Sequence, residues 1–189
     1  REVRRMQDVE YCSSILILAR EGIIDQTKSE RLDQIYKEFC EEYNDGYIDV
    51  EKTNNAMQLI KKLTQNETNG FVNKKIQMYT LFSVMFDFYE NKIDITESEI
   101  QMFEAFAKCY IMFKNEYDLQ GKDDKEQKVI EYLKKYKLAS SEGVNKLGNR
   151  MIRFEVLKKI LLKVDNLDVT CFENIMEKMK NIEIKSEEE

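Results

Sequence analysis

Two arginines lie where a charged side chain needs a binding partner. They belong to the segment 143–164, GVNKLGNRMIRFEVLKKILLKV. At about 100° per residue, the segment predicts a helix with one broad apolar face. The apolar residues on that face are Phe154, Val156, Leu157, Ile160, Leu161 and Val164. Arg150 and Arg153, the arginine pair, project from the middle of the same face. Because an unpaired buried charge is very costly, each guanidinium needs a partner or a bound anion.

Three arrangements would satisfy the arginine pair. In the first, the pair contacts Asp8 or Glu10 across a helix–helix contact, because the planar guanidinium can grip a carboxylate with two hydrogen bonds. In the second, the pair and its polar neighbours hold a phosphate of a nucleotide or nucleic acid. In the third, the pair docks onto a domain that precedes this chain. We favour the first arrangement. The predicted anion or salt-bridge cluster comprises Arg150, Arg153, Asn145, Lys146, Asn149, Asp8, Glu10 and Arg5.

The charge along the chain is uneven, although its net value is −6. Segment 21–51 contains ten acidic and three basic residues, whereas segment 134–163 contains nine basic and two acidic residues. In one interpretation, the two segments face each other or simply lie in solvent. In the other, the basic segment contacts phosphate, such as that of DNA. The sequence also leaves a homo-oligomer open.

The composition excludes several classes of site. The chain has no His, so it cannot supply an HNH nuclease centre, a His-based triad or a His metal site. Segment 44–49 resembles the middle of an EF-hand loop, but Tyr43 and Lys52 occupy positions that need oxygen ligands. We therefore predict an ordinary turn there, with Asp49 capping the next helix. Without a Gly-rich phosphate loop or a metal-spaced ligand set, we expect no catalytic residue, metal or cofactor in this chain.

The four cysteines lie far apart and form no C-x-x-C motif. Each lies beside apolar residues in a helical pattern, which predicts four buried free thiols and a cytoplasmic protein. No apolar run approaches the roughly 18 residues of a membrane span, and no signal peptide is evident. Because the sequence begins at Arg1 inside a helical pattern, we expect it to be a piece of a longer protein.

The apolar spacing predicts an all-α bundle of about eight helices joined by short turns. We expect residues 1–120 to form a helical core and residues 121–189 to form C-terminal helices that pack back on the first helix, within a single domain. At the boundary, Asp123 followed by Glu126 predicts a helix N-terminus.

Two stretches resemble one protein family. The first is Arg5-Met6-Gln7-Asp8-Val9-Glu10, followed by an apolar helix, Gly22-Ile23-Ile24-Asp25-Gln26 and the helical pattern of 32–43. The second is Ala139-Ser140-Ser141-Glu142-Gly143-Val144-Asn145 with Asn149-Arg150-Met151-Ile152-Arg153. Together they look like the helical C-terminal half of the GmrSD-like, ParB/sulfiredoxin-type proteins of bacterial restriction and phage defence.

The resemblance implies a non-catalytic interaction or sensing module, attached to an N-terminal nuclease or NTPase domain. The Asp-Gly-Gln-Gln-Arg motif of that ParB-like nuclease family does not occur in this chain, so no catalytic residue carries over. The alternative is a stand-alone α-helical DNA-binding or regulatory protein. An Asp-Gly-Gln-Gln-Arg motif upstream of Arg1 would distinguish the first reading from the second.

Overall fold

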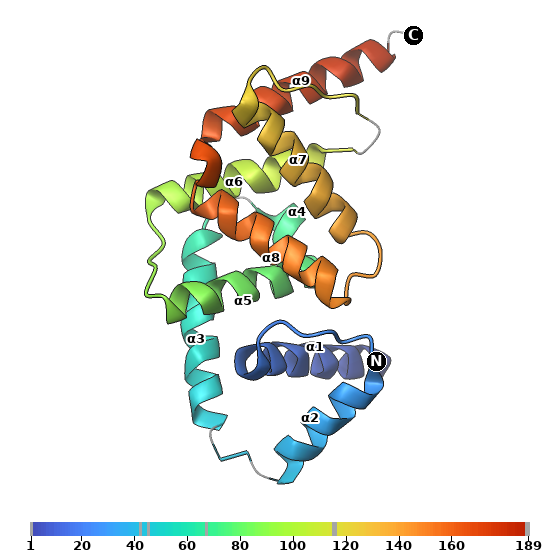
Figure 1. The fold of residues 1–189 in the computed structure, drawn as a ribbon, viewed down its shortest axis with the longest axis vertical. Coiled ribbons are helices and arrows are strands. Elements are labelled where there is room, and N and C mark those ends of the chain that lie inside the picture. Colours follow the sequence, from blue (N-terminus) through green and yellow to red (C-terminus); the bar gives the residue numbers. More distant parts are fainter. Residues whose placement is uncertain (1, 42, 45, 67, 115–116, 188–189) are drawn as a thin grey trace.

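The computed structural model describes residues 2–41, 43–44, 46–66, 68–114 and 117–187, with only the backbone described for 2–5, 41, 69 and 185–187. This part of the chain is all-helical and contains no strand, which confirms the predicted all-α bundle (Figure 1). Its elements are α1 (Glu2–Glu21), α2 (Ser29–Glu41), α3 (Gly46–Leu63), α4 (Asn69–Val72), α5 (Lys75–Glu90), α6 (Glu97–Met112), α7 (Asp124–Ala139), α8 (Leu147–Leu161), the 3₁₀ turn η1 (Val164–Asn166) and α9 (Val169–Glu187). None of the described helices is both long and apolar enough to cross a membrane.

Helices α5 and α6 form the centre of the core. Leu81, Val84, Met85 and Phe88 of α5 are fully buried, because this helix is apolar on nearly every side. Helix α3 packs along α5, and α8 packs on α5, α6 and α7. Aromatic rings from α4, α6 and α7 fill the space between these helices, several of them edge to face.

The C-terminal helices contact the rest of the chain mainly through α5 and α6. Helix α9 packs on α6 and α7, whereas α1 packs on α3 and α5. Loop 22–28, between α1 and α2, connects the N-terminal helices to the start of α8 through hydrogen bonds, described below. The division of the domain at residue 121 remains a prediction.

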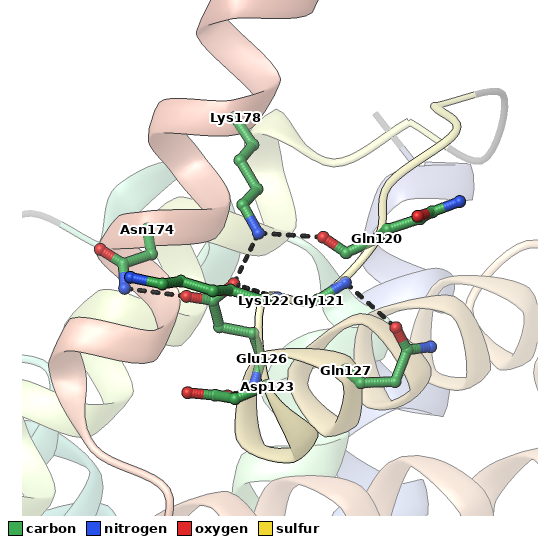
Figure 2. Close-up of polar contacts among 8 residues, drawn as sticks. All are labelled: Gln120, Gly121, Lys122, Asp123, Glu126, Gln127, Asn174 and Lys178. Carbon is green, nitrogen blue, oxygen red and sulfur yellow. Dashed lines mark hydrogen bonds and ion pairs between the residues drawn. The ribbon is translucent and has the colours of Figure 1, made fainter.

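The predicted helix start at Asp123 is confirmed (Figure 2). Asp123 accepts a hydrogen bond from the Glu126 backbone N–H, and the Glu126 carboxylate accepts one from the Lys122 N–H. Lys178 and Asn174 of α9 donate to the same carboxylate, at 2.6 and 2.9 Å. Burial disfavours the charged form of Glu126, but these hydrogen bonds outweigh it and lower the pKa of the carboxyl group. Glu126, only 2% exposed, therefore joins α7 to α9.

The sequence predicted that Asp49 caps α3, and this prediction is wrong. The helix begins at Gly46, which places Asp49 in its first turn with the carboxylate buried. That carboxylate accepts hydrogen bonds from Arg20 Nε at 3.0 Å and from the Tyr43 hydroxyl at 3.1 Å. Asp49 therefore connects α3 to the end of α1. In the described part of the chain, no cluster of three or more His, Cys, Asp or Glu residues could hold a metal ion.

The prediction of four buried thiols is wrong for two of them. Cys109 and Cys171 are buried, but Cys12 and Cys40 are exposed. Cys12 lies in α1 shortly after residues 6–10, which are also exposed. Cys40 lies in α2, most of which faces solvent.

Helix α2 is the least buried long helix. It lies at one end of the molecule beside α1 (Figure 1). Its apolar residues recur at helical spacing, yet Ile35 is the one buried residue among 29–40. The apolar face of α2 is therefore incompletely covered, and two of its side chains border a cavity.

Candidate anion-binding pocket

A cavity of about 600 Å³ lies between α1, α2, α5 and the start of α8. Helix α1 contributes Tyr11, loop 22–28 contributes Gln26, and α5 contributes Tyr79. The arginine pair lies on the same wall, and Glu10 lies at the exposed edge. The cavity thus brings together segments that are more than 100 residues apart in the sequence.

Arg150 joins three separate parts of the chain. Its Nη1 donates to the carbonyl oxygen of Ile24 at 3.1 Å and to the hydroxyl of Tyr79 at 3.0 Å. Its Nη2 donates to Gln26 Oε1 at 2.7 Å and to Asn145 Oδ1 at 3.1 Å. The guanidinium carbon also lies 4.1 Å from the centre of the Tyr79 ring, a cation–π contact.

Arg153 stabilises the turn between α7 and α8 by hydrogen bonds. Its Nη1 donates to the carbonyl oxygen of Ala139, and its Nη2 donates to that of Val144 at 2.8 Å. Its Nε donates to Thr80 Oγ1 of α5 at 3.2 Å. Ala139 is the last residue of α7, where a cation offsets the negative end of the helix dipole. With 1% of its surface exposed, Arg153 belongs to the core.

The predicted salt bridges between the arginine pair and Asp8 or Glu10 are wrong. Among the described residues, no carboxylate forms an ion pair with either arginine, and every hydrogen-bond acceptor named above is neutral. Asp8 instead pairs with Lys75 Nζ at 3.2 Å. The side chain of Arg5 lies outside the described residues. The arginines are satisfied by carbonyl, amide and hydroxyl oxygens, which cancel no charge.

The pocket wall therefore carries two buried positive charges. Burial lowers the pKa of both guanidinium groups, and the Tyr79 and Asp25 side chains partly offset this effect for Arg150. An arginine stays protonated despite such a shift. Burial raises the pKa of the Tyr11 and Tyr79 hydroxyls, so both tyrosines are neutral. A negatively charged ligand in the pocket would add to the partial compensation that Asp25 provides.

The predicted residues Asn145, Lys146 and Asn149 lie in the turn before α8 and in the first turn of that helix. The Asn145 side chain orients Arg150, and its carbonyl oxygen accepts from Gln26 N at 3.2 Å. Asn149 donates to the carbonyl oxygens of Glu142 and Gly143, which closes the turn before α8. Lys146 is exposed at the N-cap of α8, without a side-chain cap bond. Of these three, only Asn145 lines the cavity.

Three residues that line the pocket each contain a buried polar atom without a hydrogen-bond partner among the described residues: Arg150 Nε, Gln26 Nε2 and Tyr11 Oη. The orientation of the Gln26 amide is fixed, because its Oε1 accepts from Arg150. All three groups can donate a hydrogen bond. An unsatisfied buried donor costs on the order of 1–3 kcal/mol, so such groups need an explanation. These three donors are enclosed by protein atoms, within residues that line the pocket.

Sequence reasoning missed Tyr11, Gln26 and Tyr79. Tyr11 and Tyr79 fit an ordinary apolar pattern, and Gln26 lies in a loop. The one signal that could have identified Gln26 is its position in the first of the two stretches of family resemblance.

The basic segment 134–163 is only partly neutralised within the fold. Lys158 pairs with Asp87 at 2.8 Å and Lys163 pairs with Glu99 at 3.0 Å, while the arginine pair is buried. Lys134, Lys135 and Lys146 are exposed.

Comparison with known proteins adds no relative. No family model, curated protein or solved structure matches this chain.

Proposed function

We propose that this chain is a helical sensing module that binds a small phosphate-type anion in the pocket beside Arg150. One observation carries the proposal: a cavity is lined by two buried arginines that form no ion pair with a carboxylate among the described residues. A tetrahedral oxyanion has enough acceptor oxygens to satisfy donors from several directions. Its charge would offset the charge of the arginine pair.

The pocket supports recognition rather than catalysis. Arg150 is held by four hydrogen bonds and a stacked ring, so it is oriented before any ligand arrives. The tyrosine hydroxyls on the wall are neutral and not activated as nucleophiles. A preoriented cation with neutral donors favours binding without a chemical step.

The module would report on its ligand through loop 22–28. Arg150 holds this loop by the Ile24 carbonyl and the Gln26 side chain, and the loop leads directly into α2. A ligand at Arg150 would therefore act on the anchor of the least buried long helix. In keeping with the family resemblance, we propose that the full protein is a bacterial restriction or phage-defence nuclease or NTPase, with its enzymatic domain upstream of Arg1.

Isothermal titration calorimetry with inorganic phosphate and sulfate tests the binding proposal. We expect saturable binding by the wild type and by Gln34→Glu, an exposed control in α2. We expect at least about tenfold weaker binding by Gln26→Glu, because the new carboxylate repels an anion beside Arg150. Equal binding by the wild type and Gln26→Glu would contradict the proposed site.

The alternative function is a stand-alone DNA-binding or regulatory helical protein, for which the exposed Lys134, Lys135 and Lys146 would supply the phosphate contacts. Filter binding with duplex DNA at low salt tests it. This alternative requires an affinity that falls steeply with salt and decreases in Lys146→Glu. An absence of binding at low salt would exclude it.

A further inference from the structure

The pocket lining also includes apolar surface that an inorganic anion would leave unused. Leu32 and Tyr36 of α2 contribute to it, together with Ile17 of α1 and Ile76 of α5. Cavities of roughly 300–1,000 Å³ hold ligands of drug or cofactor size, and this one measures about 600 Å³. The volume and the mixed lining indicate a ligand that carries both an anionic group and an apolar group.

The ring of Tyr36 is the surface available to that apolar group. Three aromatic rings line the pocket, and cations occupy two of them: Lys75 Nζ lies 5.5 Å from the Tyr11 ring centre, and Arg150 covers Tyr79. Tyr36 is 41% exposed and has no ring contact or hydrogen bond within the described part of the chain. A flat ring of the ligand could stack on it without displacing a protein group.

We propose that the ligand is a nucleoside phosphate. Its phosphate would lie beside Arg150, Gln26 and Tyr11, and its base would stack on Tyr36 beneath α2. This inference rests on the proposed anion site and adds the chemical class of the ligand. It also explains why the apolar face of α2 is incompletely buried: the base completes its packing.

Calorimetry with four probes tests the ligand class: inorganic phosphate, AMP, UMP and adenosine. We expect the better of the two nucleotides to bind the wild type about tenfold more tightly than phosphate, as one stacked base contributes. Adenosine, which lacks the anion, should bind more weakly than AMP.

Two variants complete the experiment. Tyr36→Ala should remove the advantage of the nucleotide and leave the affinity for phosphate unchanged. Tyr89→Ala, at an exposed tyrosine of α5 outside the pocket, should bind all probes like the wild type. If nucleotides bind no more tightly than phosphate, the nucleotide inference fails and the anion site stands. If neither phosphate nor nucleotide binds, the proposed function fails as well. Adenosine binding as tightly as AMP would also overturn the inference.

Discussion

Arg150 Nη2 donates to Gln26 Oε1 at 2.7 Å, and this bond leaves Gln26 Nε2 buried without an acceptor. The arginine thereby fixes the orientation of the amide. Arg150 Nε and the Tyr11 hydroxyl, in residues that line the same cavity, are also buried without partners. If this pocket served only the stability of the fold, a glutamate at position 26 would be more favourable, because it leaves no unsatisfied donor.

That comparison gives the first prediction. Gln26→Glu keeps the oxygen that Arg150 contacts, removes one unsatisfied donor and adds a counter-charge. We expect the melting temperature to rise by about 2–4 °C, which corresponds to roughly 1 kcal/mol for a chain of this size. Differential scanning calorimetry measures the change, with Gln34→Glu as the control. A lower melting temperature for Gln26→Glu would show that the site does not need a negative charge.

Arg153 should contribute more to stability than any surface arginine. Arg153→Met removes the donor to Ala139, Val144 and Thr80 inside the core, so three acceptors lose their partner. We expect a loss on the order of 3 kcal/mol in the free energy of unfolding, measured by urea denaturation. Arg31→Met, which breaks an exposed pair with Glu21, should cost less than about 1 kcal/mol. Similar losses in the two variants would contradict the structural role of Arg153.

The Glu126 carboxylate should make the protein sensitive to acid. Its pKa is lowered in the folded state, so its contribution to stability is present above the ordinary value of roughly 4.3 and is lost as the pH falls through the folded pKa. Glu126→Gln should therefore be less stable than the wild type at pH 7, and this difference should shrink at pH 3. Urea denaturation at both pH values measures it, with the exposed Glu97→Gln as control. A difference that is the same at both pH values would refute the ionic role of Glu126.

Thiol labelling should separate the four cysteines into two classes. Cys12 and Cys40 are exposed and should react with Ellman's reagent in the native protein. Burial raises the pKa of Cys109 to about 12, so it should react only after unfolding, and the buried Cys171 should be similarly protected. Rapid labelling of all four thiols without denaturant would contradict the packing of α6 and α9.

Some of these features could be predicted from the sequence because they depend on local patterns. The helical spacing of apolar residues predicted the all-α fold, and the Asp123–Glu126 spacing predicted the start of α7. The partners of Glu126 in α9 could not be predicted, since Lys178 is 52 residues away and lies in an ordinary amphipathic pattern.

The arginine pair shows the limit of this reasoning most clearly. The sequence predicted that Arg150 and Arg153 lie on an apolar face and need a partner or a bound anion, and both are buried. It suggested carboxylates, because these are the acceptors visible in a side-chain pattern. The main acceptors include the carbonyl oxygens of Ile24, Ala139 and Val144, and every residue has a carbonyl group. Only the path of the backbone determines which carbonyls reach a guanidinium, and that path is a tertiary property.

The most direct test of the account is the affinity of inorganic phosphate for the wild type and for Gln26→Glu, measured by calorimetry at neutral pH. We expect saturable binding of one phosphate per chain by the wild type and a loss of at least about tenfold in Gln26→Glu, because like charges repel in a site of low dielectric. Equal affinity in the two proteins, or no binding by a folded wild type, would contradict the claim that the pocket beside Arg150 is an anion site.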